Sequence, residues 1–242
     1  MSWPFKHTCV INLDSRPDRW ARIEAHLERL GIGAQRFAAV SMHDLADDQP
    51  CDELKLFLLR TDGQSEQSDH KLRATWACMR SHLAVIARAK SLGWPEVVIL
   101  EDDCEFESYA PAVMRHVHSQ LQGREWSMLY LGGTPKKGGE QLKVSRNLFS
   151  VSRVRLAHAY VVKADLYERI LEEAPRSGLP LDWYYSEVLL PAVRGLMVYP
   201  ELARQRLMDV SDIEQVVRLP KLKTRQRLQR FIANLRYGRI FH

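Results

Sequence analysis

The 242-residue chain lacks features that would place it in several classes of protein. It has no run of about 18 to 20 apolar residues, so no segment is expected to cross a membrane. Its start leads straight into a strand-like segment, without the basic and then apolar stretches of a signal peptide. Its four cysteines form no CxxC pair and no cluster with zinc-ligand spacing, which predicts free thiols in a reducing compartment. We therefore expect a cytoplasmic protein.

The residues that are present suit a globular fold with a charged appendage. Hydrophobic residues make up 45% of the chain and charged residues 27%, enough for a sizeable core. The net charge of +5 is uneven, because Arg218 to Arg239 contains eight Lys or Arg and no acid. We expect one domain over residues 1–213 and a basic tail over residues 214–242.

The order of the predicted elements is typical of an α/β fold. A strand over residues 7–13, a helix from Pro17 to Gly31 and a strand over 37–40 form a βαβ unit. An amphipathic helix over 74–92 leads to the apolar strand 97–100, of the kind buried in mid-sheet. Further strands are expected over 128–131, 149–155, 159–162 and 196–199, and helices over 110–121, 165–174 and 183–190. Residues 42–69 are expected to be a long loop with a short helix at 54–59.

Three acids, Glu101, Asp102 and Asp103, follow the strand 97–100 directly. Ligands of open α/β sheets bind at the carboxyl ends of the strands. Adjacent ionised carboxylates repel one another, and a divalent cation would offset that repulsion. The alternative is a solvated acidic loop. A nucleotidyltransferase or phosphoryl-transfer enzyme also fits acids at a strand end, although the chain has no GxxxxGK[ST] loop.

Six segments, in sequence order, carry a resemblance to a known family. They are VINLDSRPDRW (10–20), ACMRSH (77–82), VILEDD (98–103), HAYVVK (158–163), LPLD (179–182) and YPEL (199–202), the last followed by Gln205 and SDI (211–213). Together they resemble glycosyltransferase family 25, which includes bacterial lipooligosaccharide galactosyltransferases and animal collagen galactosyltransferases. Residues 42–73 match poorly, and the tail lies outside the resemblance.

The resemblance implies a GT-A type fold, which is a Rossmann-like α/β sandwich with a mostly parallel sheet. It implies an inverting transfer of a hexose, most often galactose from UDP-galactose, to a hydroxyl of a lipooligosaccharide or other cell-surface glycan precursor. A protein hydroxyl is an alternative acceptor, and a nucleotide-sugar binding module without catalysis is an alternative function.

The resemblance and the strand-end positions together predict the site residues. Asp103 with Glu101 would hold Mn²⁺ or Mg²⁺, and Asp182 would be the general base. Donor contacts are expected from Asn12, Arg16, Arg19, Ser41, Ser81, His82, Glu101 and Asp102. Asp209 and Asp212 are further candidates for the metal shell. The alternatives are a surface position for Asp102, a solvated position for Arg19, a packing role for His82 and a helix N-cap for Asp182.

The basic tail has its own helical pattern. Leu228, Phe231, Ile232 and Leu235 recur at i, i+3, i+4 and i+7 among basic residues. Helices of this kind bind anionic membrane surfaces, which predicts peripheral attachment to the inner face of the cytoplasmic membrane and suits a lipid-linked acceptor. The alternative is that the apolar stripe packs on the domain. No nucleic acid is expected, because stacking aromatics are missing from the tail.

Overall fold

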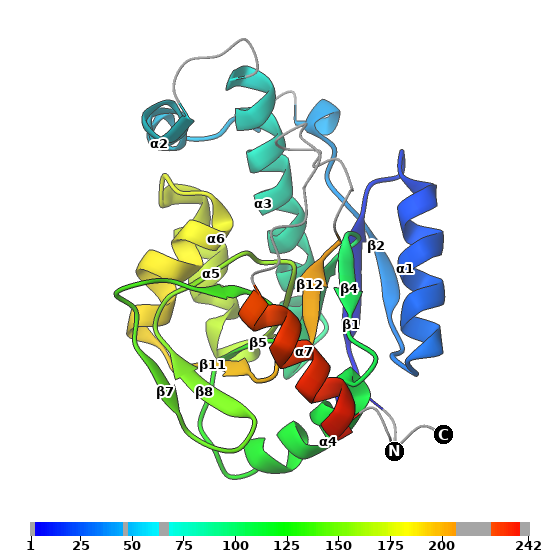
Figure 1. Ribbon diagram of the computed structural model, residues 1–242. Coiled ribbons are helices and arrows are strands. Elements are labelled where there is room, and N and C mark those ends of the chain that lie inside the picture. Colours follow the sequence, from blue (N-terminus) through cyan, green and yellow to red (C-terminus); the bar gives the residue numbers. More distant parts are fainter. Residues whose placement is uncertain (1–2, 46–47, 63–67, 207–223, 238–242) are drawn as a thin grey trace.

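A central sheet of eight strands organises the fold (Figure 1). The computed structural model describes residues 3–45, 48–62, 68–206 and 224–237. The strands follow the order β2-β1-β3-β10-β5-β11-β8-β7. They are β1 (Thr8–Asn12), β2 (Gln35–Ala38), β3 (Glu96–Glu101), β5 (Met128–Tyr130), β7 (Gln141–Lys143), β8 (Leu148–Val151), β10 (Ala159–Lys163) and β11 (Gly195–Val198). All point in one direction except β8 and β10, which confirms the expected mostly parallel sheet.

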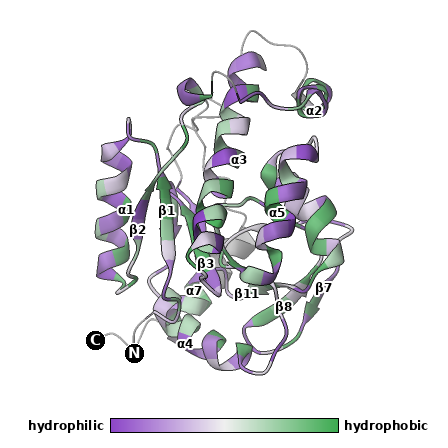
Figure 2. Ribbon diagram, turned by 180° about the vertical axis from the view of Figure 1, so that it is seen from behind, coloured by the Kyte–Doolittle hydropathy of each residue, from purple (hydrophilic) through white to green (hydrophobic). Residues whose placement is uncertain are grey.

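Helices cover both faces of this sheet. One face packs against α3 (Ser68–Ser91), α5 (Tyr167–Glu173) and α6 (Leu181–Tyr184), with α2 (Asp52–Asp62) beside α3. The other side holds α1 (Pro17–Arg29), α4 (Ala110–Leu121) and α7 (Thr224–Tyr237). The two layers confirm an α/β sandwich. Figure 2 shows the hydrophilic outer face of α1 and the hydrophobic strands behind it.

The β3 strand is the clearest case of a residue pattern that fixes the packing. Val97 and Ile99 face the core beneath α3, whereas Val98 and Leu100 face the core beneath α1 and α4. Successive side chains of a strand point to opposite faces, so a strand between two helical layers must be apolar throughout. All four side chains are fully buried, as the sequence predicts.

The opening βαβ unit also forms as predicted. Both β2 and β3 pair with β1 in parallel. The α1 helix begins at Pro17 and stops before Gly31, which adopts φ +66° and donates its N–H to the carbonyl of Glu28. Glycine adopts this left-handed backbone at little cost, so it is a common helix terminator.

Two expectations about the elements are wrong. The expected strand over 149–155 is two strands, because β8 belongs to the large sheet and β9 (Val154–Arg155) pairs with β6 (Thr134–Pro135). The loop expected over 42–69 is largely helical, since α2 has 11 residues and α3 already begins at Ser68. The strands β6 and β9 are too short to show a periodic pattern in the sequence. The helix α2 is long enough, but it is only weakly amphipathic.

A second small sheet, not predicted, shapes the edge at which β3 ends. There β4 (Cys104–Phe106) pairs with β12 (Ala203–Gln205). The α6 helix continues as a π-helical turn over Tyr185–Leu189.

All four cysteines are free thiols, as predicted, and Cys9 and Cys104 are buried. Within the described ranges, no helix combines the length and the apolar character that a bilayer span requires.

Candidate active site

The acidic turn that follows β3 lies at the carboxyl edge of the sheet. Glu101 is the last residue of β3, and Asp102 and Asp103 make the turn into β4. The Glu101 side chain is 25% exposed, whereas Asp102 and Asp103 are each 7% exposed. The pairing of β4 with β12 brings Gln205 Nε2 to 3.4 Å from Glu101 Oε2. The acids are therefore mostly enclosed, and the alternative of a solvated acidic loop is wrong.

Asp102 is held in a buried network with Asn12 and Arg19. Asn12 Nδ2 donates to Asp102 Oδ2 at 2.8 Å, and Arg19 Nη1 lies 3.1 Å from Oδ1. Burial raises the pKa of Asp102, while the Asn12 hydrogen bond and the Arg19 charge oppose that shift. Neither Asp102 nor Arg19 is solvated, so both alternatives given for them are wrong. The network ties β1 and α1 to the acidic turn.

Three further predicted donor contacts have local partners on the same half of the sheet. Arg16 makes a two-pronged ion pair with Asp18, with Nε and Nη2 both 3.1 Å from its carboxylate. Ser41 caps a short 3₁₀ helix over Met42–Asp44. Ser81 Oγ accepts from the Val40 N–H at 2.9 Å and so ties α3 to the segment that carries Ser41. Their contacts with a donor stay predictions.

His82 joins α3 to Glu101. It is 1% exposed, and its Nδ1 lies 3.0 Å from Tyr160 Oη, which in turn lies 3.1 Å from Tyr185 Oη. Its Nε2 lies 3.5 Å from Glu101 Oε1 and makes no hydrogen bond to any described residue. Cys78 stands one helical turn earlier, and the thiol, the imidazole and the Glu101 carboxylate all lie within 4.8 Å of one another. His82 thus packs in the core and also borders the acids.

Asp182 approaches the same acids from α6. It is the second residue of that helix, and Pro180 occupies the N-cap position, so the N-cap alternative is wrong. Its Oδ2 accepts from the N–H of Leu156 at 3.3 Å. Leu156 has φ +73°, a left-handed backbone that costs a leucine free energy and is typical of functional sites.

The environment of Asp182 raises its pKa. Burial is the main cause and the negative charge of Glu101 adds to it, while the Leu156 N–H and Arg155 oppose it. Burial is the main cause that raises the pKa of the Cys78 thiol, and the negative charges of Glu101, Asp182 and Asp103 raise it further. These three predicted carboxylates, one each from the end of β3, the turn and α6, therefore lie in the neighbourhood of Cys78. Asp209 and Asp212 lie outside the described residues.

Four residues beside Asp182 were not predicted from the sequence as site residues. Lys136, Arg153 and Arg155 all make ion pairs with Glu187. They come from the loop after β6, the link between β8 and β9, β9 itself and the π-helical turn, segments that share no spacing in the sequence. A pattern search along the chain had no means of joining them.

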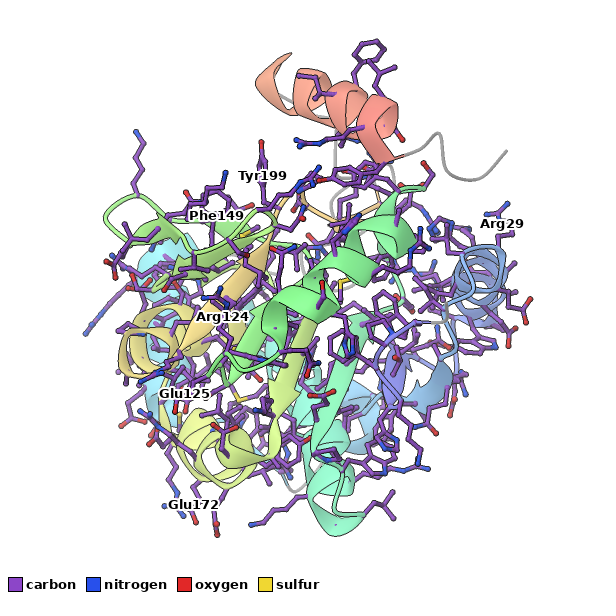
Figure 3. The ribbon with its side chains drawn as sticks, turned by 90° about the horizontal axis from the view of Figure 1, so that it is seen from below. Arg29, Arg124, Glu125, Phe149, Glu172 and Tyr199 are labelled. Carbon is purple, nitrogen blue, oxygen red and sulfur yellow. The ribbon has the colours of Figure 1, made fainter. Side chains whose placement is uncertain are left out.

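A hollow in the surface lies away from these acids. It measures about 470 Å³ and is lined by residues at the amino ends of β5 and β11, among them Arg124, Glu125 and Arg194. Arg194 and Glu125 form an ion pair there. Figure 3 views the molecule from below and labels Arg124 and Glu125. Because β5 and β11 run in the same direction as β3, their amino ends lie at the sheet edge opposite the acidic turn. None of the predicted site residues lines this hollow.

The comparison with known proteins decides the family. Residues 5–179 match glycosyltransferase family 25 (LPS biosynthesis protein). This chain belongs to glycosyltransferase family 25. The resemblance stated from the six segments is thereby confirmed, and with it the GT-A type Rossmann-like sandwich that the resemblance implied. The family match includes α3 and the acidic turn but ends before Asp182 and α7.

Individual relatives have low sequence identity to this chain. A glycosyltransferase 25 family member of Aedes aegypti is 28% identical over 188 residues, which is 74% of this chain and 30% of the relative. One of Drosophila pseudoobscura pseudoobscura is 30% identical over 129 residues, or 52% of this chain and 20% of the relative. The family 25 chain thus spans less than a third of the length of these relatives. A UDP-glucose pyrophosphorylase complexed with UDP-glucose has a TM-score of 0.42 and 10% identity, covering 96% of this chain and 99% of that one.

Proposed function

We propose that this family 25 chain is an inverting glycosyltransferase. It transfers a hexose, foremost galactose from UDP-galactose, to a hydroxyl of a lipooligosaccharide or other cell-surface glycan precursor. The observation that carries the proposal is the enclosed acidic turn at the carboxyl end of β3, where Glu101 ends the strand beside the opening βαβ unit and Asp103 follows it. Asp182 of α6 lies close enough for the charge of Glu101 to raise its pKa. In α/β sheets of this kind that edge is where nucleotides bind.

The acids fit a divalent cation. Glu101 and Asp103 offer hard carboxylate oxygens, the ligands that Mg²⁺ and Mn²⁺ prefer, and their mutual repulsion favours a bound cation. Both residues would hold the ion, and it would offset the negative charge that develops on the leaving diphosphate. His82 Nε2, 3.5 Å from Glu101, orients that carboxylate through the buried contact of its Nδ1 with Tyr160.

Asp182 is the proposed general base. In the reaction the acceptor oxygen forms a bond to C1 of the donor sugar while the bond from C1 to the diphosphate oxygen breaks. The proton of the acceptor hydroxyl passes to the Asp182 carboxylate. Its raised pKa makes it a stronger proton acceptor than an exposed aspartate, and the Leu156 N–H and Arg155 hold it in position.

The donor nucleotide is proposed to lie over the β1–α1–β2 half. Arg16 and Ser41 stand on this side, and the Asn12–Arg19–Asp102 network supports it from below. Arg16 carries the guanidinium geometry that suits a phosphate.

Nucleotide release with a panel of UDP-, GDP- and CMP-sugars tests the proposal, with Mn²⁺, Mg²⁺ or EDTA and with water as a slow acceptor. The expected result is metal-dependent release from UDP-galactose. Binding of the donor without release, even when sugar and hydroxyl-bearing peptide acceptors are added, would support the alternative of a binding module. A lack of binding to every donor would overturn the proposal.

The tail helix α7 supports a further part of the proposal, an anionic membrane surface as partner. One face of α7 contacts the domain. Arg230 pairs with Glu107, and Tyr237 Oη accepts a hydrogen bond from Asn147 Nδ2 at 3.2 Å. Phe231, Ile232 and Leu235 are instead 60%, 51% and 48% exposed. The alternative in which this stripe packs on the domain is therefore wrong for these three residues. The Leu228 side chain lies outside those described.

Charge argues for an anionic lipid as the occupant of this stripe. The segment from Arg218 to Arg239 has eight Lys or Arg and no acid, and each basic residue near an anionic surface contributes about 1 kcal/mol of attraction. An apolar stripe beside such charge is the pattern of an interfacial helix. We place the partner at the inner face of the cytoplasmic membrane, where a lipid-linked acceptor would be found.

Sedimentation with vesicles of phosphatidylglycerol and phosphatidylcholine tests this partner. The wild type is expected to bind the anionic vesicles, and the triple variant F231S/I232S/L235S to lose at least tenfold in affinity. The matched control is L92S/L142S, which removes two apolar side chains that are each 56% exposed elsewhere. Equal binding of both variants would contradict the proposal, and self-association of the wild type that the triple variant abolishes would assign the stripe to a second copy of the chain.

A further inference from the structure

A cluster of cations lies beside the proposed base, and the function proposed above leaves it without a role. Lys136 Nζ and Arg155 Nη2 each lie 3.2 Å from Glu187 Oε1, and Arg153 Nη2 contacts Oε2 of the same carboxylate. We call Lys136, Arg153 and Arg155 the cationic cluster. Three positive charges thus share a single carboxylate.

An aromatic ring holds two members of the cationic cluster in place. The Arg155 guanidinium lies 3.0 Å from the ring centroid of Trp183, and Lys136 Nζ lies 4.3 Å from it. Phe57 supports the ring edge-on, with a centroid distance of 4.9 Å. Trp183 follows Asp182 directly, so the ring that orders the cations belongs to the same turn as the base. Cations fixed in this way lose little side-chain entropy when an anion binds.

The charge of the cationic cluster is not balanced locally. Glu187 offsets one positive charge and Asp182, near Arg155, offsets part of another, so the cluster keeps an excess. Burial and the charges of Arg155 and Arg153 lower the pKa of Lys136, and burial and the charge of Arg153 lower the pKa of Arg155. Lys136 and Arg153 are 33% and 30% exposed, so a ligand can reach them. A bound anion would relieve the repulsion.

The position of the cationic cluster points to the acceptor and not to the donor. The proposed donor site lies on the β1–α1–β2 half and at Glu101 and Asp103. The cluster lies on β9 and on the loops beside β6 and β9, and Asp182 adjoins it, because its carboxylate accepts from the N–H of Leu156, the residue after Arg155. The base must touch the acceptor hydroxyl, so the cluster adjoins the acceptor.

We propose that Lys136, Arg153 and Arg155 form an anion site that selects an acceptor bearing a phosphate or carboxylate close to the hydroxyl that is glycosylated. The assignment of this anion to the glycosylated acceptor rests on the proposed function. The anion site itself rests on the ion pairs, the Trp183 ring and the unbalanced charge. Its ligand is a phosphorylated or acidic sugar.

Calorimetric binding of small probes tests the anion site without any need for turnover. The probes are glucose 6-phosphate, glucuronate and uncharged glucose, each titrated into the wild-type protein in the presence and absence of UDP with Mn²⁺. We expect glucose 6-phosphate or glucuronate to bind more tightly than glucose, and which of the two binds distinguishes phosphate from carboxylate. The double variant K136M/R153M is expected to weaken that binding about tenfold or more.

A matched control separates a local effect from loss of surface charge. The variant K90M/R194M removes two cations that each pair with a single carboxylate outside the cationic cluster, Lys90 with Glu168 and Arg194 with Glu125. It is expected to bind the charged probe as the wild type does. Equal binding of glucose and both charged probes to the wild type would overturn the proposal, and so would unchanged binding in K136M/R153M.

Binding of UDP and nucleotide sugars distinguishes a failure of the anion site from a failure of the proposed glycosyltransferase function. If K136M/R153M loses affinity for UDP and not for the charged sugars, the cationic cluster belongs to the donor site and the inference fails, while the glycosyltransferase proposal stands. If the wild type binds charged sugars through the cluster but binds no nucleotide sugar, the anion site stands and the proposed function fails.

Discussion

Two groups of arginines and carboxylates flank the acidic turn, and they differ in how their charges are met. Arg19 and Asp102 are 5% and 7% exposed and pair with each other, and Asp102 also accepts from Asn12. Around Glu187, three cations meet one carboxylate and remain partly exposed. A buried group with balanced charge holds elements together, whereas an open group with excess charge is free to bind. The same residue types thus serve as scaffold in one place and as a candidate ligand site in the other.

The largest expected effect comes from the base that adjoins the open group. Asp182→Asn keeps the size of the side chain and its contact with the Leu156 N–H but removes the proton acceptor. Loss of a general base typically lowers the rate about 10²- to 10⁴-fold, and we expect that loss in kcat with little change in donor binding. Steady-state kinetics on the accepted donor and calorimetry of UDP binding measure both. Asp165→Asn, away from the site, is the control, and kcat within twofold of wild type for Asp182→Asn would contradict the assignment.

The second prediction compares how much each group contributes to the stability of the fold. Arg19→Met leaves Asp102 buried beside Asn12 without its counter-charge, and breaking a buried pair of this kind costs about 3–5 kcal/mol. Arg153→Met removes one of three cations from a partly exposed group, where such pairs contribute about 0–1 kcal/mol. Urea unfolding of both variants provides the comparison. Equal losses of stability would show that the two groups do not differ as described.

Glu201 shows what burial does to the pKa of a carboxylate. Burial raises the pKa of Glu201 to about 7 from an ordinary 4.5, although the Gly133 N–H donates to it at 3.1 Å and the charges of Arg230 and Arg204 oppose the shift. A raised folded-state pKa gives stability that is complete below pH 4.5 and is lost as the pH rises through about 7. Glu201→Gln should therefore match the wild type near pH 4.5 and exceed its stability by roughly 3 kcal/mol above pH 8. Thermal unfolding across this pH range checks the sign, and a constant difference would refute it.

The sequence predicted the elements whose pattern is long or strongly apolar. The β3 strand was predicted from its continuous apolar run, and α1 and α3 from the helical spacing of their apolar residues. The end of α1 was predicted from Gly31. The strands β6, β9 and β12 have two or three residues each, too few for a period to appear, and their pairing depends on contacts across the fold.

The site was predictable to the extent that it is contiguous in sequence. Glu101 and Asp103 come at the end of one strand, and Asp182 follows a short recognisable segment, so the sequence predicts all three as site residues. That Asp102 belongs to a buried network depends on Asn12 and Arg19 reaching it through the sheet, which no local pattern encodes. The cationic cluster is joined only by the fold, and its members resemble ordinary surface residues in the sequence.

The most direct test compares two neighbouring acids, Asp102→Asn and Asp103→Asn, by calorimetric titration of UDP with and without Mn²⁺, alongside urea unfolding. The account predicts that Asp103→Asn loses the Mn²⁺-dependent part of UDP binding and keeps most of its stability. Asp102→Asn should lose stability and keep Mn²⁺-dependent binding under conditions in which it is folded. Wild-type Mn²⁺-dependent affinity in Asp103→Asn would contradict the proposed metal site and the transferase mechanism built on it.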